Sequence, residues 1–263
     1  MKMRSRLLGM VVLLVGLGSG SLVSAQEREL KVKAGEKIAF MGDSITQAGN
    51  GKNGYVTFVM DALNREGLQV THIPAGISGH KSSNMLARLD RDVLSKKPDW
   101  MVLSCGVNDV WHFTLRLGKR TFQGVELEDY KKNIRAMVEK AGTSGVKVMI
   151  LTSTMIGEDP EKGTNKTLAP YNDFLRKLAA EKNLPLADLN KEMQVALGKI
   201  PDEKGKARMY GEPEYDRKIA NKLTTDGCHM NTLGNIMMAR GVLRTFGLAE
   251  EKIAKAEKGW LGK

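Results

Sequence analysis

Two short polar segments, far apart in the chain, together contain a nucleophile, a base and an acid. Gly42-Asp43-Ser44-Ile45 directly follows the apolar run 37–41, and Asp226-Gly227-Cys228-His229 directly precedes a stretch of helical period. A serine hydroxyl becomes a nucleophile when a base accepts its proton and a carboxylate orients that base and stabilises its charged form. Ser44, His229 and Asp226 supply these three groups if the fold brings them together.

Each segment also has a simpler explanation. A Ser on a Gly-containing turn after a strand is common, and Thr46 departs from the G-x-S-x-G pattern of α/β hydrolases. Asp226 could serve only as the cap of the following helix, and a lone His is more often structural than catalytic. The chemistry is therefore indicated by the combination of segments and not by any one of them.

Two further turns contain groups that could hold the negative oxygen formed when a serine attacks a carbonyl. Ser78-Gly79 follows the apolar run 69–73, and Gly106-Val107-Asn108-Asp109 follows the run 100–105. The backbone N–H groups of Ser44 and Gly79 and the side-chain amide of Asn108 are potential donors to such an oxygen. Taken alone, Gly79 could belong to an ordinary turn and Asn108 could be a turn former or helix cap.

The elements that must position these groups follow an alternating pattern. Apolar runs of strand length alternate with longer segments of helical period, which predicts a parallel sheet covered by helices. Stretches 156–167 and 201–222 lack apolar periodicity and are expected to be surface loops. In open α/β sheets ligands bind at the carboxyl ends of strands, where three of the four polar segments lie. Strands are expected at 37–41, 69–73, 100–105, 147–152 and 185–188, and helices at 55–65, 84–95, 127–141, 170–182, 231–246 and 249–258.

The four segments, in this order, resemble the four blocks of the SGNH (GDSL) hydrolases over roughly residues 37 to 246. The resemblance implies a flavodoxin-like, three-layer α/β/α sandwich with about five parallel strands. It implies a catalytic triad of Ser44, His229 and Asp226, an oxyanion hole formed by Ser44, Gly79 and Asn108, and no need for a metal or an organic cofactor. Ile45 stands where the family usually has Leu, which removes no chemical group.

A closer resemblance concerns the substrate. Lys97-Pro98-Asp99-Trp100 and Gly106-Val107-Asn108-Asp109-Val110-Trp111 are similar to segments of bacterial SGNH acetylesterases that act on xylan and related sugars. This similarity implies an acetylated oligo- or polysaccharide as substrate, with Asp43, Trp111 and His112 near it. Trp111 and His112 could equally cap and pack the loop after the third strand. A short-chain lipase, lysophospholipase or thioesterase of the same fold and a catalytically silent carbohydrate-binding protein remain the alternatives.

The N-terminal residues have the pattern of an export signal. Lys2, Arg4 and Arg6 precede the apolar run 7–17, and small residues then lead to Ala25. This order predicts a cleaved signal peptide over 1–25, a single domain over 26–263, and a periplasmic or extracellular location. The apolar run is shorter than the roughly 20 residues that a membrane span needs, so no stable membrane insertion is expected after cleavage.

The composition is basic but carries no nucleic-acid signature. The formal net charge of +11 falls to +8 without the signal segment, and the basic residues are mixed with acidic ones. No nucleic-acid-binding motif accompanies the charge, so nucleic acid is not an expected partner. A preference for acidic polysaccharides or anionic surfaces is compatible with this balance. The oligomeric state is not predicted.

The chain contains two cysteines, Cys105 and Cys228, each beside one of the polar segments. They are too few and too far apart for a disulfide framework or a zinc site. Because both should lie near the floor of the site in an oxidising compartment, a disulfide between them is a hypothesis, with buried free thiols as the alternative.

Overall fold

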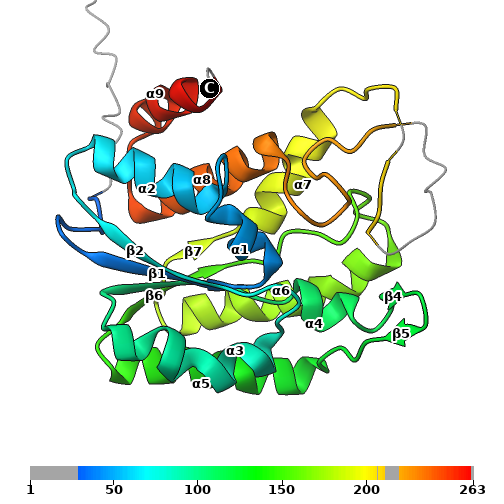
Figure 1. Ribbon diagram of the computed structural model, residues 1–263, viewed down its shortest axis with the longest axis horizontal. Coiled ribbons are helices and arrows are strands. Elements are labelled where there is room, and N and C mark those ends of the chain that lie inside the picture. Colours follow the sequence, from blue (N-terminus) through cyan, green and yellow to red (C-terminus); the bar gives the residue numbers. More distant parts are fainter. Residues whose placement is uncertain (1–28, 206, 211–218, 262–263) are drawn as a thin grey trace, which may run out of the picture.

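The computed structural model describes residues 29–205, 207–210 and 219–261, and a parallel five-stranded sheet lies at its centre (Figure 1). The predicted signal segment 1–25 lies outside the described residues. The spatial order of the strands is β2-β1-β3-β6-β7. The chain therefore adds β2 on one side of β1 and the later strands on the other side, so the strand order changes direction between β1 and β3. The strands are β1 (Lys37–Gly42), β2 (Thr71–Gly76), β3 (Trp100–Ser104), β6 (Lys147–Leu151) and β7 (Leu186–Ala187).

The central strands are those whose apolar runs are continuous. Every residue of β3 is buried, because helices cover both faces of the sheet. The edge strand β2 begins two residues later than expected and contains Pro74, which an edge strand tolerates because one of its sides needs no partner. The predicted three-layer arrangement with five parallel strands is confirmed.

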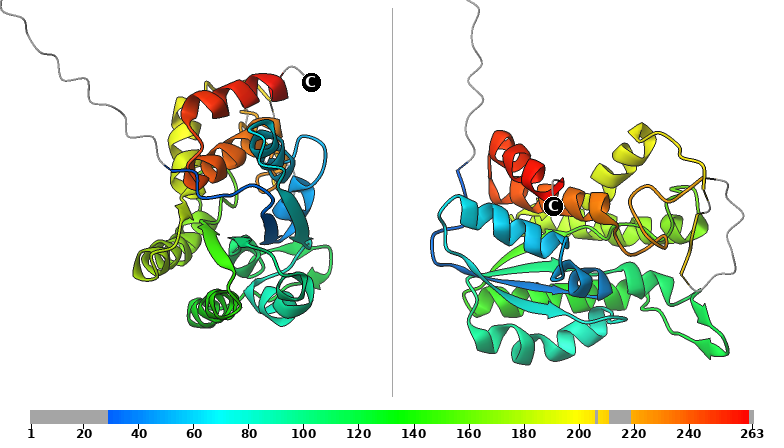
Figure 2. Two further views of the ribbon diagram at one scale, coloured as in Figure 1. Left: turned by 90° about the vertical axis from the view of Figure 1, so that its left-hand side faces the viewer. Right: turned by 45° about the horizontal axis from the view of Figure 1, so that its top comes forward.

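Helices form the two outer layers of the sandwich, as the views in Figures 1 and 2 show. One layer contains α3 (Ser82–Asp92), α5 (Leu127–Thr143) and α6 (Gly163–Glu181), and the other contains α2 (Tyr55–Arg65) and α8 (Thr232–Phe246), with α7 (Leu189–Lys199) and α9 (Glu250–Leu261) beside α8. Helix α2 directs its apolar stripe, including Val56, Val59 and Leu63, into the core, as its period predicted. Two short helices, α1 (Ser44–Gly49) and α4 (Val107–Trp111), follow β1 and β3 directly, and a 3-10 helix, η1 (Leu94–Lys96), follows α3.

One local expectation was wrong, and two elements were not predicted. Helix α6 begins at Gly163, so part of the expected loop 156–167 is helical and Pro170 lies inside the helix. Helix α7 had no counterpart in the prediction, because only three of its residues are buried and they form no regular stripe. A small antiparallel hairpin, β4 (Arg116–Leu117) and β5 (Arg120–Thr121), projects beside α4 (Figure 1).

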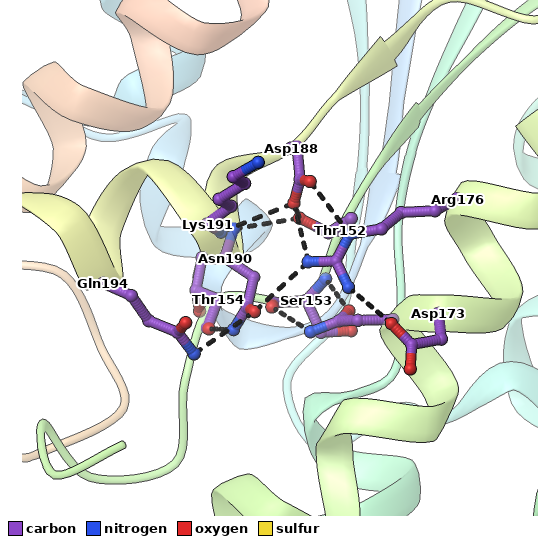
Figure 3. A network of polar contacts seen from close by, with 10 residues as sticks. Thr152, Ser153, Thr154, Asp173, Arg176, Asp188, Asn190, Lys191 and Gln194 are labelled. Atoms are coloured by element: carbon purple, nitrogen blue, oxygen red, sulfur yellow. Dashed lines mark hydrogen bonds and ion pairs between the residues drawn. The ribbon is translucent and has the colours of Figure 1, made fainter.

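A polar network fixes α6 against the carboxyl ends of β6 and β7 (Figure 3). The Arg176 guanidinium donates from Nε to Asp188 Oδ2 and from Nη2 to Asp188 Oδ1, each at 2.9 Å. Burial raises the pKa of Asp188, but the hydrogen bonds from Arg176 outweigh it and leave the pKa below its ordinary value. Thr152 also donates to Asp188, at 3.1 Å. The network thereby holds the carboxyl ends of β6 and β7 in place against α6.

The two ends of the described chain lie on the same side of the molecule. The Lys31 backbone N–H donates to the Phe246 carbonyl at the end of α8, at 2.7 Å. Trp260 of α9 stacks on Phe58 of α2 with 4.6 Å between ring centroids, and its Nε1 donates to Asp61 at 2.8 Å. No helix among the described residues has the length and apolarity needed to cross a bilayer.

Candidate active site

Ser44 stands at the first position of α1, immediately beyond the carboxyl end of β1. Asp43 caps this helix, because its carboxylate accepts the Ile45 N–H at 2.9 Å. The first backbone N–H groups of a helix have no acceptor within the helix. The Ser44 N–H is one of these, and the turn therefore presents both a hydroxyl and a free donor at the sheet edge.

The structure brings Ser44, His229 and Asp226 into one hydrogen-bonded chain. The Ser44 hydroxyl lies 2.9 Å from His229 Nε2, and His229 Nδ1 lies 2.7 Å from Asp226 Oδ2. A carboxylate can only accept, so Nδ1 carries the proton and Nε2 is left to accept the proton of Ser44. The three residues can thus perform the proton transfer that makes a serine hydroxyl nucleophilic.

The turn between Asp226 and His229 holds this geometry. Asp226 Oδ1 accepts the backbone N–H groups of Cys228, at 3.1 Å, and of His229, at 2.8 Å. Gly227 has a φ of 82°, a left-handed conformation that side chains rarely adopt and that lets the turn close. Asp226 therefore orients both the ring and the backbone of His229.

The pKa values of His229 and Asp226 shift in opposite directions. The hydrogen bond that His229 donates to Asp226 raises the pKa of His229 above its ordinary 6.5, although burial acts against it. Burial raises the pKa of Asp226, but the hydrogen bonds from His229 outweigh it and the net pKa lies below 3.8. Asp226 is consequently ionised near neutral pH and stabilises a proton on His229.

The other two predicted oxyanion donors, Gly79 and Asn108, line the same cavity as Ser44. Asn108 Nδ2 donates to the His80 carbonyl at 3.1 Å, which leaves its second N–H for another acceptor. The Gly79 N–H makes no hydrogen bond to any described residue, and the φ of Gly79, 75°, is left-handed. The Gly79 turn is held in place because Ser78 N–H donates to Gln47 at 2.7 Å.

A cavity of about 660 Å³ opens onto these groups. Trp111 and His112, two of the predicted substrate-contacting residues, line it, as does Tyr210, which the sequence did not single out. Tyr210 packs edge-on against both Trp111, at 5.9 Å between centroids, and His229, at 6.1 Å. Asp43 does not line the cavity: it is 2% exposed and lies behind Ser44, where burial raises its pKa to about 6.

A carboxylate that the sequence did not reveal clamps the loop that leads to Asp226. Glu158 Oε1 accepts the backbone N–H groups of Leu223, at 2.8 Å, and Thr224, at 2.7 Å, and also the Thr224 hydroxyl at 2.7 Å. Glu158 Oε2 accepts the Lys222 N–H at 2.6 Å. Thr224 Oγ1 in turn accepts the Gly227 N–H at 3.0 Å. The clamp thereby extends to the turn that carries Asp226 and His229.

A buried arginine joins the two sides of the site and was likewise not predicted. Arg88 of α3 is 3% exposed, and its Nη2 donates to the Gly42 carbonyl at 2.9 Å, at the end of β1. Its Nε donates to His80 Nδ1 at 3.0 Å, next to the Gly79 turn. Burial lowers the pKa of His80, and the charge of Arg88 lowers it further. Arg88 therefore links the Ser44 turn to the Gly79 turn.

The hypothesis of a disulfide was wrong. Cys105 and Cys228 are separate, buried thiols, and the Cys105 thiol lies 3.5 Å from Asp109 Oδ2. Burial raises the pKa of both thiols well above the ordinary value, so neither is a ready thiolate. Within the part of the chain that the structure describes, no three His, Cys, Asp or Glu side chains gather as a metal site would require.

Comparison with known proteins identifies relatives over most of the chain. The sequence matches the GDSL-like Lipase/Acylhydrolase family over residues 40–235. The acetylxylan esterase of Geobacillus stearothermophilus is 26% identical over 232 residues, which cover 83% of this chain and 97% of that protein. The esterase TesA of Pseudomonas aeruginosa is 31% identical over 120 residues, which cover 45% of this chain and 54% of TesA.

Two crystal structures of acetylxylan esterases share the fold. That of AlAXEase is 33% identical with a TM-score of 0.67, and the match covers 79% of this chain and 98% of that one. That of Axe2 from Geobacillus stearothermophilus is 25% identical with a TM-score of 0.69, and the match covers 83% and 97%.

Proposed function

The chain belongs to the GDSL-like lipase/acylhydrolase family, and from this premise we propose that it hydrolyses acetyl esters on carbohydrates with Ser44 as nucleophile. His229 is the general base and Asp226 is its orienting partner. The observation that carries the proposal is the continuous path from the Ser44 hydroxyl through the His229 ring to the Asp226 carboxylate, at 2.9 and 2.7 Å.

The reaction proceeds in two halves through an acyl-enzyme. His229 Nε2 takes the Ser44 proton as Oγ attacks the acetyl carbonyl, and the carbonyl oxygen becomes negative. The N–H groups of Ser44 and Gly79 and the amide of Asn108 stabilise that oxygen. His229 then gives the proton to the departing sugar oxygen, and a water molecule, deprotonated by His229, releases acetate from Ser44.

The acetyl-carbohydrate assignment is supported by the relatives and by the cavity. Two relatives with near-complete coverage of their own length are named acetylxylan esterases. Trp111 and Tyr210 place aromatic rings at the cavity, and such rings provide apolar surface together with a polar edge. Both properties suit a sugar, which presents C–H faces and hydroxyl rims.

The assignment is tested by rates on aryl esters of increasing acyl length and by acetate release from acetylated glycans, with Ser44→Ala as control. We expect acetyl to be the best acyl group and Ser44→Ala to be inactive. A rate that rises beyond four carbons would assign the site to a lipase or thioesterase. Absence of both hydrolysis and a covalent adduct with a serine-directed inhibitor would identify a silent carbohydrate-binding protein.

We also propose that the protein is exported after removal of residues 1–25. The support is the order of basic, apolar and small residues in that segment. Mass spectrometry of the protein recovered from periplasmic extract and from culture medium should find a chain that begins at Gln26. A chain that retains Met1 in the cytosolic fraction alone would contradict export.

A further inference from the structure

The charged side chains around the cavity are of one sign. Lys81 and Arg120 line it, whereas none of its described lining residues is Asp or Glu. His80 and His112 also line it, but burial lowers the pKa of each, and the charge of Lys81 or Arg88 lowers it further. The pKa of His112 is about 4, and His229, which also lines the cavity, is paired with the Asp226 carboxylate. Among the described lining residues, the charge at neutral pH that has no acidic partner therefore comes from Lys81 and Arg120.

The β4–β5 hairpin adds to this positive rim. Residues 113–125 include Arg116, Lys119 and Arg120 and no acidic residue. Arg116 donates to the carbonyls of Phe113 and Leu115, which fixes the hairpin without neutralising the charge. None of the three cations forms an ion pair with a residue that the structure describes.

The two lining cations differ in their freedom to bind a ligand. Lys81 Nζ donates to the Gln123 carbonyl at 2.6 Å, and Lys81 also borders a neighbouring hollow that contains Glu126 and Asp129. Arg120 is exposed, and its planar guanidinium can bind a carboxylate or sulfate with two parallel hydrogen bonds. Arg120 is therefore the main candidate for direct contact, and Lys81 contributes charge from the cavity wall.

We propose that the natural substrate is an anionic glycan, in which a carboxylate or sulfate lies close enough to the acetyl ester for both to occupy the Ser44 cavity. The inference rests on the proposed acetylesterase function. Arg120 binds the anion while Ser44 attacks the ester. Because Arg120 is exposed, salt screens its attraction to the anion, so the preference should be greatest at low salt and should shrink as salt is added.

The test compares three acetylated xylo-oligosaccharides of equal length: one neutral, one with a single uronic acid and one with a single sulfate. At about 20 mM NaCl we expect kcat/KM for at least one acidic substrate to exceed that for the neutral one by about five- to tenfold, falling below about twofold at about 500 mM. The acidic substrate with the larger ratio identifies the anion. Arg120→Gln should bring the ratio near one, and Arg120→Lys should retain part of it.

Lys119→Gln is the matched control, because it removes one charge from the same hairpin at a residue that does not line the cavity. Because Lys119 adds only distant charge, the substitution should lower the ratio much less than Arg120→Gln does. Equal or faster turnover of the neutral substrate at low salt would overturn the anionic-glycan inference and leave the esterase proposal standing. Calorimetric binding of the deacetylated oligosaccharides gives a readout that does not need catalysis: tighter binding of an acidic one supports the inference, and equal binding overturns it.

Discussion

Glu158→Gln is the substitution that most directly tests whether the loop clamp positions the candidate triad. The change keeps the size of the side chain and one of its acceptor oxygens. That oxygen can replace Oε1, which has three donors, but the new NH₂ group then faces the Lys222 N–H and cannot accept it. One half-buried N–H loses its partner, at a cost of about 1–3 kcal/mol, and three charge-assisted bonds become neutral ones.

We therefore expect Glu158→Gln to lower the free energy of unfolding by about 2–4 kcal/mol, measured by urea denaturation. Because the weakened segment ends two residues before Asp226, we also expect kcat on an aryl acetate to fall by about tenfold, which corresponds to about 1.4 kcal/mol of barrier. Glu161→Gln is the control, since Glu161 lies in the same loop and its side chain is 79% exposed. A Glu158→Gln enzyme with reduced stability and unchanged kcat would show that the clamp does not position the triad.

Four further predictions concern the site itself. Asn108→Ala should lower kcat by about 100- to 1000-fold with little change in KM, because one oxyanion donor is lost; an equal loss in binding of a substrate analogue would contradict that role. Asp226→Asn should lower kcat by roughly 10³- to 10⁴-fold by disturbing the His229 tautomer. In the wild type kcat/KM should rise with pH through a midpoint above 6.5, since His229 must be neutral to accept a proton, and Asp226→Asn should move that midpoint down. Asp43→Asn should keep the helix cap and raise the free energy of unfolding at pH 7 by up to about 3 kcal/mol. The reason is that folding raises the pKa of Asp43 from 3.8 to about 6, so the stability of the wild type falls as pH rises between these values. Urea denaturation at about pH 4 and pH 7 checks that this fall disappears in the variant.

The strands and most helices could be predicted because their signal is local. The run Trp100–Ser104 is buried throughout, and its continuous apolar sequence indicates a central strand. The helical spacing of the apolar residues in α2 likewise indicates, within a few residues, which face packs against the core. Helix α7 buries little apolar surface, and the beginning of α6 precedes Pro170, a residue that usually marks a helix start. In both cases tertiary contacts outweighed the local pattern.

The candidate triad could be predicted because its residue types and their order are distinctive, although only the fold brings position 44 to position 229. Glu158 could not, because it contacts backbone N–H groups 64 to 66 residues away and backbone donors leave no mark in a sequence. Arg88 was missed for a related reason, since a basic residue in an amphipathic helix normally faces solvent. Tyr210 lies in a charge-rich stretch without apolar periodicity, so nothing in the sequence indicates that this stretch reaches the cavity.

The described chain enters the fold near the amino end of β1, whereas Ser44 follows the carboxyl end of that strand (Figures 1 and 2). Before β1 begins, the Lys31 backbone pairs with the end of α8. A fusion partner, affinity tag or solid support joined ahead of Glu29 would therefore be attached behind the catalytic face. Immobilised in this way, the protein would present its cavity outward to polymers too large to diffuse beneath it. Attachment through the β4–β5 hairpin would obstruct the same approach.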